Sequence, residues 1–274
     1  QYEAAGAYRR LGLWDKSESA AYDAARRFAH AGNSALAALA RIRIADILQE
    51  RGRFDDALTI YENDVLPVFE RLGDMYLAAI TKGRIADVLQ RQGRLDEALA
   101  IHENDQIPAF ERLGDVRAVA FTKGKIADVL LVRGRLDEAR AIYENDLLPV
   151  FERFGDLRMA TLTKGRIAII LQARGRFNDA LAIYENDELP VYERLGDVHA
   201  VAVTKGRIAD ILRAQGRLDE ALAIYETDQL PIYERLCDMR AAAIVKAKIA
   251  DIQQARSRRD AAFINGKPND SSRQ

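Results

Sequence analysis

Residues 115–155 read DVRAVAFTKGKIADVLLVRGRLDEARAIYENDLLPVFERFG, and close copies of this 41-residue stretch fill most of the 274-residue chain. One proline per copy marks the period. These prolines, each 41 residues from the next, are Pro67, Pro108, Pro149, Pro190 and Pro231. Glycine keeps the same interval in three series: Gly52, Gly93, Gly134, Gly175 and Gly216; Gly73, Gly114, Gly155 and Gly196; and Gly83, Gly124, Gly165 and Gly206. A fixed period of this length is typical of stacked supersecondary units.

Two helices are expected in each unit. In the quoted copy, helix A follows Asp115, whose side chain can accept hydrogen bonds from the free amides of the first turn. Its apolar residues recur at mostly helical spacing up to residue 132, and Gly134 can adopt the left-handed conformation that closes a helix. Helix B is expected from about residue 136 to 154, with acidic residues in its first turn, where they suit the positive end of the helix dipole.

Each proline of the series falls inside helix B. Because proline lacks an amide hydrogen and its ring clashes with the preceding turn, it costs about 3 kcal/mol in a straight helix interior. Five such costs would rival the stability of a whole domain. Helix B is therefore expected to bend near each proline or to be divided into two pieces there. The sequence leaves both alternatives open.

The copies also define the expected organisation of the chain. Residues 1–32 resemble a degenerate hairpin without the proline, residues 33–237 form five 41-residue hairpins, and residues 238–256 form a final helix A. Residues 257–274 are polar and are expected to be a disordered tail. Because the sequence starts without methionine, inside what reads as a helix, we expect it to be part of a longer protein.

Composition excludes several classes of protein. Lys plus Arg (41) nearly balances Asp plus Glu (42), so the chain lacks the bulk positive field that favours nucleic acid. The single cysteine, Cys237, suits a reducing cytoplasm and is expected to pack as a small apolar residue. No run of about 18 apolar residues is present to span a membrane, and residues 1–10 lack the apolar core of a signal peptide. A soluble, cytoplasmic protein is expected.

The turn between helices A and B carries a resemblance to a known family. The pattern there is a small residue, a large apolar residue, a glycine, an alanine and an aromatic residue. One copy has Ala127, Leu130, Gly134, Ala139 and Tyr143 at these positions, and the next has Ala168, Leu171, Gly175, Ala180 and Tyr184. This pattern resembles the tetratricopeptide repeat over roughly residues 33–256. The resemblance implies an all-α fold, a right-handed α-solenoid of antiparallel helical hairpins, acting as a protein-interaction scaffold.

The copies depart from the common form of that repeat. They are longer than its usual length of about 34 residues, lysine replaces the usual tryptophan, and alanine replaces the usual glycine of helix A. In length they resemble the repeats of kinesin light chains, of polarity adaptors of the Leu-Gly-Asn type, and of sensor arms in bacterial signalling NTPases. The near-identity of the copies favours the last, bacterial group.

A row of aspartates is the first candidate site. In the family the residue after the small alanine of helix A contacts bound peptides, and here that position holds Asp46, Asp87, Asp128, Asp210 and Asp251, with Ile169 replacing aspartate once. Such a row favours a basic peptide or helix. The alternative is ordinary surface ion pairing, since Arg84, Lys125 and Arg207 each precede an aspartate by three residues.

Glycine and lysine form two further rows in helix A. Gly83, Gly124, Gly165 and Gly206 are expected either to allow close helix packing or flexing, or to give a ligand access to the backbone. Lys82, Lys123, Lys164, Lys205 and Lys246 are expected to pair with acidic residues of the Glu-Asn-Asp segments of helix B. Those segments do not predict a metal site, because adjacent residues on a helix diverge by about 100 degrees.

No motif indicates catalysis or a cofactor. His30, His102 and His199 are scattered, and the sequence has no phosphate-binding loop, no Cys/His metal spacing and no nucleophile elbow. The sequence leaves two functions open. One is a scaffold that binds a protein or peptide segment on the face formed by the A helices. The other is a structural, sensor or self-assembling arm of a larger NTPase or effector protein, which would need no separate ligand.

Overall fold

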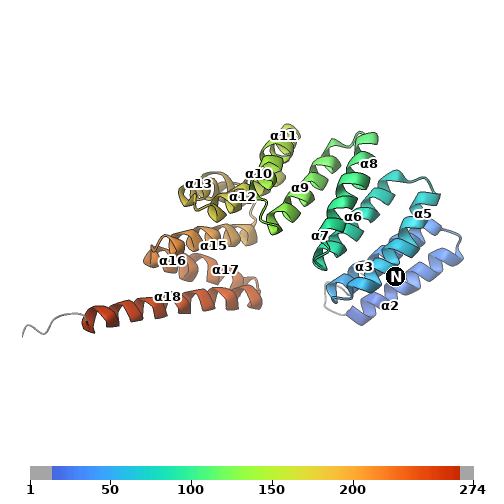
Figure 1. Ribbon diagram of the computed structural model, residues 1–274. Coiled ribbons are helices and arrows are strands. Elements are labelled where there is room, and N and C mark those ends of the chain that lie inside the picture. Colours follow the sequence, from blue (N-terminus) through green and yellow to red (C-terminus); the bar gives the residue numbers. More distant parts are fainter. Residues whose placement is uncertain (1–13, 266–274) are drawn as a thin grey trace, which may run out of the picture. The chain divides into compact units, whose positions relative to one another are not determined.

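The computed structural model describes the backbone of residues 14–265 and the side chains of residues 14–257. Within residues 14–265 the chain forms helices joined by short turns and no strand (Figure 1). The all-α hairpin fold expected from the 41-residue period is therefore confirmed. The chain divides into two compact units, residues 1–150 and 151–274, which meet inside the helix α11.

The first unit contains an opening helix, two complete hairpins and most of a third. Its elements, in which η marks a π-helical segment, are α2 (Trp14–His30), α3 (Ser34–Glu50), α4 (Phe54–Thr59), η1 (Ile60–Val65), α5 (Leu66–Arg71), α6 (Met75–Arg91), α7 (Leu95–Ile101), η2 (His102–Gln106), α8 (Ile107–Arg112), α9 (Val116–Val132), α10 (Leu136–Ile142) and η3 (Tyr143–Leu147). The unit boundary then falls within α11 (Leu148–Arg153).

The second unit contains two complete hairpins and a final long helix. Its elements are α12 (Leu157–Ala173), α13 (Phe177–Ile183), η4 (Tyr184–Glu188), α14 (Leu189–Arg194), α15 (Val198–Ala214), α16 (Leu218–Ala223), η5 (Ile224–Gln229), α17 (Leu230–Arg235) and α18 (Met239–Asn265). The last helix runs past Arg256, where the sequence analysis placed the end of helix A. Residues 266–274 of the expected tail, and residues 1–13 of the expected first hairpin, lie outside the described residues.

Helix A begins and ends as its sequence predicts. The Asp115 side chain accepts a hydrogen bond from the Ala118 amide at 2.9 Å, and Asp74 and Asp197 cap their helices in the same way. At the other end Gly134 has a φ of 74°, and the amide of the next residue, Arg135, bonds back to the Leu130 carbonyl. The glycine closes the helix because it adopts a left-handed conformation without a Cβ clash.

Cys237 occupies the place that glycine holds at the ends of the other B helices. Its φ of 55° makes it the one non-glycine residue with a positive φ in the described chain, and its side chain is exposed. The prediction that Cys237 packs as a small apolar residue is therefore wrong. The position lies just beyond the end of α17, where the chain reverses at the surface.

Helix B widens into a π-helical segment immediately before each proline. In the hairpin of α6, the Ile107 amide bonds to the His102 carbonyl five residues back, and Pro108 follows within the first turn of α8. The residue before the proline makes the same bond in the other four hairpins. The wider turn accommodates a residue that cannot donate a hydrogen bond, so helix B stays helical through the proline and is not divided by a loop.

The core lies where each helix A meets its own helix B and the next hairpin. In the first unit α6 packs on α7 and η2, while η2 also contacts α9. Aromatic residues of helix B such as Tyr61 and Phe69 are fully buried, in one core cluster with alanines of helix A such as Ala45. Each large buried side chain contributes about 1.5–3 kcal/mol relative to exposure. Alanine opposite an aromatic ring lets the helices approach closely.

Candidate protein-binding face

Three of the predicted aspartates bond to tyrosines inside their own hairpins. The Tyr61 hydroxyl donates to Asp46 at 2.8 Å, and Tyr143 and Tyr225 donate to Asp128 and Asp210, each at 2.5 Å. Burial and the adjacent Asp46 carboxylate raise the pKa of Tyr61, and burial with the Asp210 bond does the same for Tyr225. Tyr61 and Tyr225 therefore stay protonated and keep donating at any physiological pH.

Asp46, Asp87 and Asp210 each hold a basic residue of the next helix A. Arg84 Nη1 lies 2.7 Å from Asp46 Oδ1, Lys125 is paired with Asp87, and Lys248 Nζ lies 2.7 Å from Asp210 Oδ2. The ion pairs predicted within one helix, Arg84 with Asp87 and its copies, instead run between successive helices at these positions. Most of the aspartate charge is thus neutralised within the chain.

Two copies depart from this arrangement. His102 replaces tyrosine, bonds through Nδ1 to Gln106 Oε1 at 2.6 Å, and buries Nε2 without a hydrogen-bond partner. Burial lowers the pKa of His102. In the copy where Ile169 replaces aspartate, the buried Tyr184 hydroxyl likewise has no partner, and burial raises the pKa of Tyr184 to about 12.

The carboxylate missing at Ile169 is supplied from helix B. Glu188, 2% exposed, places Oε1 3.3 Å from Nη1 of Arg207, the basic residue of the next helix A. Burial raises the pKa of Glu188, because its ionised form loses hydration that Arg207 restores only in part. Here the basic residue of the next helix A is held by helix B of the preceding hairpin.

The four predicted glycines of helix A face their own helix B. A Cβ added at Gly83 would lie 2.1 Å from the Gln106 amide nitrogen, and one at Gly206 would lie 2.0 Å from the Gln229 amide nitrogen. Gly124 and Gly165 are covered in the same way by Leu147 and Glu188. This geometry is that of close helix packing, the first of the two alternatives that the sequence left open.

The lysine row pairs with helix B as predicted. Lys82, Lys123 and Lys164 lie 2.5, 2.5 and 2.6 Å from Asp105, Asp146 and Asp187, the last residue of each Glu-Asn-Asp segment. Lys205 makes the same pair with Asp228 at 3.2 Å. Lys246 follows α17 and pairs with Glu234 instead. The first four lysines therefore join the two helices of a hairpin, whereas Lys246 joins α18 to the preceding hairpin.

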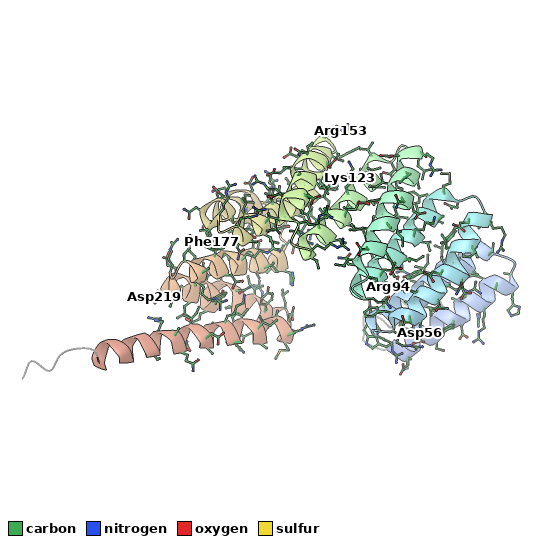
Figure 2. All side chains as sticks on the ribbon, viewed as in Figure 1. Asp56, Arg94, Lys123, Arg153, Phe177 and Asp219 are labelled. Atoms are coloured by element: carbon green, nitrogen blue, oxygen red, sulfur yellow. The ribbon has the colours of Figure 1, made fainter. Side chains whose placement is uncertain are left out.

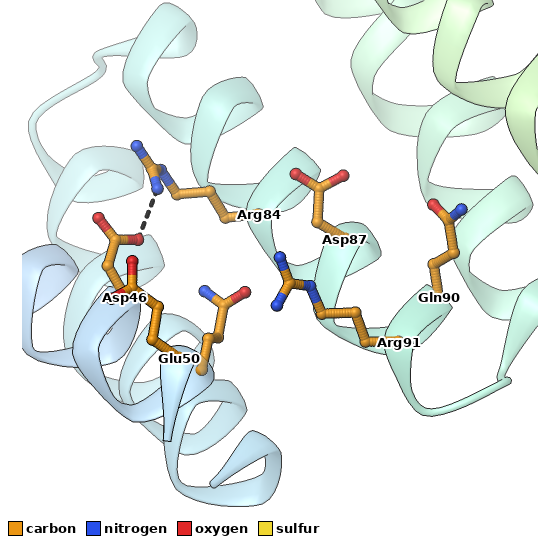
Figure 3. Close-up of a pocket in the computed structure, with 7 residues that line it drawn as sticks. Asp46, Glu50, Arg84, Asp87, Gln90 and Arg91 are labelled. Carbon is orange, nitrogen blue, oxygen red and sulfur yellow. Dashed lines mark hydrogen bonds and ion pairs between the residues drawn. The ribbon is translucent and has the colours of Figure 1, made fainter. Parts of the chain in front are cut away.

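A hollow of about 550 Å³ opens between helices α3 and α6 in the first unit. Figure 3 shows Arg84 and Asp46 facing each other across it, with Asp87 and Arg91 beside them. Gln49, Glu50 and Gln90 complete its lining. Arg91 is exposed and has no ion-pair partner among the described side chains. The hollow is polar and holds charges of both signs.

A row of apolar residues follows the same face, and the sequence analysis missed it. In the second unit Val203 and Ile244 line a smaller hollow together with Asp210. One, two and three periods of 41 residues before Val203, the equivalent positions hold Leu162, Phe121 and Ile80. Phe121, Leu162 and Ile244 are exposed. The signal was available, because these residues share the 41-residue period and lie one helical turn before the basic residues Arg84, Lys125, Arg166, Arg207 and Lys248.

No cluster typical of a metal site or membrane span emerges from the described part of the chain. Within it, no three His, Cys, Asp or Glu side chains come close enough together to share a metal ion. None of its helices combines the length and apolar character needed to cross a bilayer. Asp251, the last of the aspartate row, is exposed on α18 and makes no ion pair with any other described residue.

Comparison with known proteins agrees with the hairpin geometry. Two tetratricopeptide repeat models match the chain, one over residues 157–227 and the other over residues 86–102 and 127–145. No curated protein matches its sequence significantly. The hairpins and these matches define a class, the helical repeat proteins that present one face of stacked helices. Within that class the chain is a tetratricopeptide-like repeat protein.

Several solved structures share the fold at low sequence identity. A Signal Transduction ATPase with Numerous Domains (STAND) protein from Pyrococcus horikoshii, which has a tetratricopeptide repeat sensor, superposes with a TM-score of 0.70 at 14% identity, over 97% of this chain and 38% of that one. A Rap protein complexed with Competence and Sporulation Factor gives 0.63 at 12%, over 94% and 75%. A putative kinesin light chain from Podosopora anserina gives 0.56 at 14%, over 70% and 94%.

Proposed function

We propose that the chain is a protein-interaction scaffold that holds a segment of a partner protein on the face formed by its A helices. The observation that carries this proposal is the combination, in each unit, of an open hollow and exposed apolar residues on the A helices. Exposed apolar rows bordered by polar groups are typical of protein-binding surfaces.

The partner segment would contact the apolar row and the charged residues beside it. The sequence analysis favoured a basic ligand on the aspartates Asp46, Asp87, Asp128, Asp210 and Asp251. Because Asp46, Asp87 and Asp210 are already paired with Arg84, Lys125 and Lys248, their attraction for a basic ligand is reduced. We therefore assign most of the binding energy to apolar contact, with mixed charges fixing the register of the segment.

The ion pairs also dictate how the proposal should be tested. Reversing the aspartates would break bonds to Tyr143 and Tyr225 and links between helices, so it would mix binding with stability. Phe121→Glu together with Ile244→Glu places one charge on the exposed row of each unit. A matched control, Leu113→Glu with Leu195→Glu, changes equally exposed apolar residues at helix ends.

The test is affinity capture from native lysate with the original chain and both variants, each first shown to be helical by circular dichroism. Partners retained by the original and the control but lost by Phe121→Glu/Ile244→Glu would support the scaffold. Equal retention by all three would contradict binding on this face. Identification of the retained protein then permits direct measurement of its dissociation constant.

A sensor or structural arm of a larger protein is the second candidate. It is favoured by the likeness to the STAND protein of Pyrococcus horikoshii, because nearly all of this chain matches a minor part of that longer protein. In that case the A-helix face would pack on an attached domain. Capture of no partner by the isolated array, with recovery of binding when the domain is supplied, would favour the arm.

A further inference from the structure

The fourth hairpin has a buried carboxylate in helix B that the other four hairpins do not have. Glu188 is the last residue of η4. At the same place the other hairpins have residues that do not ionise, namely Val65, Gln106, Leu147 and Gln229. The fourth hairpin is also the one in which Ile169 replaces the aspartate of helix A. Figure 2 labels Phe177 and Asp219, which lie in the first turn of helix B in this hairpin and in the next, both within the second unit.

Glu188 is buried more deeply than the aspartates that hold the basic residues of the other A helices. Its side chain is 2% exposed, whereas those of Asp46, Asp87 and Asp210 are 12%, 38% and 28% exposed. Its Oε1 lies 3.3 Å from Nη1 of Arg207, compared with 2.7 Å in the ion pairs of Asp46 and Asp210. Among the described side chains Arg207 makes no other ion pair. The negative charge of Glu188 thus loses its hydration and is compensated by a single, longer contact.

Both the ionised and the neutral form of Glu188 have favourable contacts. The ionised carboxylate is paired with Arg207, but its Oε2 is buried and accepts no hydrogen bond from any described residue. The neutral carboxyl would gain a hydrogen-bond donor. Two buried hydroxyl groups without hydrogen-bond partners, those of Thr204 and Tyr184, belong to its surroundings. The protonation of one oxygen therefore selects between two arrangements of the same side chains.

Few charged groups surround Glu188. The titratable and charged groups on the elements packed around it are Arg207 of α15, Tyr184 of η4, Tyr192 of α14, and the ion-paired Lys164 of α12 and Asp187 of η4. Helix α12 meets the carboxyl with Gly165, where an added Cβ would lie 2.8 Å from Oε1. Burial raises the pKa of Glu188, and Arg207 opposes this effect. The state of Glu188 is thus set mainly by its burial and by one arginine.

Arg207 connects Glu188 with the face formed by the A helices. Its guanidinium carbon lies 5.7 Å from the centre of the Tyr184 ring, which favours a cation–π contact. Its side chain also lines the hollow of about 230 Å³ to which Val203 and Ile244 belong. A guanidinium that separates from Glu188 can keep its contact with the ring and stay beside this hollow.

We propose that Glu188 and Arg207 form a pH-sensitive switch, in which protonation of Glu188 releases the Arg207 guanidinium to the hollow on the A helices. The proton comes from solvent and adds to Oε2, so the net charge of the pair rises by one. On acidification the second unit then presents one more free cation on its A helices, and helix B of the fourth hairpin loses its ion pair with helix A of the fifth. The switch needs no bound partner, so it stands or falls separately from the scaffold function.

NMR titration of the full chain tests the switch, from about pH 7.5 down to about pH 4. The range used is the one in which circular dichroism shows the chain to be helical. The side-chain carboxyl of Glu188 should titrate with a midpoint above about 4.3, the ordinary value for glutamate. The Nε–H signal of Arg207 should shift with the same midpoint, because the guanidinium changes its surroundings when its partner is neutralised.

A glutamine variant removes the charge and keeps the shape of the side chain. Glu188→Gln should abolish the shift of the Arg207 signal, which at neutral pH should already lie where the acidified original places it. Glutamine is the natural residue at Gln106 and Gln229, so this position accepts it. Glu185→Gln is the matched control, because it removes an exposed carboxylate from the same segment, and it should leave the transition unchanged.

Ile169→Asp provides a second test that does not depend on the glutamine variant. The new carboxylate would give Arg207 the kind of partner that Arg84 has in Asp46, so Glu188 should titrate at a higher pH than in the original chain. The inference is overturned by a Glu188 midpoint at or below the ordinary value, or by an Arg207 signal that does not follow it. A transition that persists in Glu188→Gln, or a Glu188 midpoint unchanged by Ile169→Asp, would overturn it as well.

Discussion

Cys237 takes up a conformation that the other four hairpins give to glycine. Its φ of 55° lies close to the 65–68° of Gly73, Gly114, Gly155 and Gly196, and the Asp238 amide bonds to the Tyr233 carbonyl as the matching amides do in those copies. A side chain in the left-handed region places Cβ near the following carbonyl. Packing does not offset this strain, because the Cys237 side chain is exposed.

Cys237→Gly is therefore expected to stabilise the chain by about 1 kcal/mol, as the left-handed conformation then carries no Cβ penalty. The reverse change, Gly196→Cys, should destabilise it by a similar amount. Urea unfolding followed by circular dichroism measures both. An unchanged midpoint for Cys237→Gly would show that the backbone at this turn relaxes without strain.

His102 stands where other copies have a tyrosine, and it does not make the bond that the tyrosine hydroxyl makes to the aspartate of helix A. In three other copies the tyrosine hydroxyl reaches the aspartate of helix A, whereas the shorter imidazole of His102 leaves Nε2 buried without a partner. Burial lowers the pKa of His102 in the folded chain below its value near 6.5 in the unfolded chain. Between these two pKa values the unfolded chain binds a proton that the folded chain does not.

The free energy of unfolding should thus fall as pH drops below about 6.5, since stability rises with pH wherever the unfolded state binds more protons. His102→Tyr should remove this part of the pH dependence. It should also raise stability at neutral pH by about 1 kcal/mol, through a hydroxyl bond to Asp87. Unfolding curves at several pH values test both effects. An identical pH profile in the variant would assign the dependence to other groups.

At the scale of elements, the distance between helices A and B of a hairpin depends on the side chain that faces the glycine of helix A. Gly206 contacts the Gln229 amide, and Gln229 is the last residue of the π-helical segment η5. The widened turn brings this side chain onto helix A, and only a residue without Cβ leaves room for it. This need for space explains why helix A contains glycine, although glycine has a lower helix propensity than alanine.

Gly206→Ala is expected to destabilise the chain by about 1–2 kcal/mol despite the higher helix propensity of alanine, because the added Cβ displaces a buried amide. Gln229→Ala creates the missing space. The double variant should thus be more stable than the sum of the single changes predicts, with a coupling of about 1 kcal/mol or more. Thermal unfolding of the four proteins measures the coupling, and strict additivity would exclude the contact.

At the scale of the whole molecule, side-chain bonds between hairpins join direct neighbours. Arg84 reaches back to Asp46, Lys125 to Asp87, and Lys248 to Asp210, each 38 residues earlier. At the turns, Gln92 reaches Asp55 and Arg256 reaches Asp219 in the same manner. Contacts of this kind give a stability that is close to a sum over hairpins and their interfaces.

Removal of residues 238–274 should therefore lower the unfolding midpoint without abolishing the fold of the remaining hairpins. The loss should be several kcal/mol, because Val245, Ile249 and Ile252 of α18 are buried against the preceding hairpin. Circular dichroism should show helix lost in proportion to the residues removed. Complete unfolding of residues 1–237 would contradict the nearest-neighbour model.

Part of this architecture follows from sequence alone. The period, the hairpin, the Asp115 cap and the left-handed Gly134 depend on the residue itself or on close neighbours in the chain, so local chemistry is sufficient. The pairing of Lys82 with Asp105 was also predictable, because both residues belong to one hairpin. The exposed apolar row that includes Ile244 was overlooked although it carries the same 41-residue period.

Other features were decided only by tertiary structure. Whether Asp46 faces solvent or a neighbouring Arg84 depends on how two A helices, 38 residues apart in the chain, are packed. The glycine series alone could not separate a binding surface from a packing contact, because the deciding atom is the Gln106 or Gln229 side chain brought over by the π-helical turn. Local propensities act within a helix, whereas the partner of each side chain is set by the distances between helices.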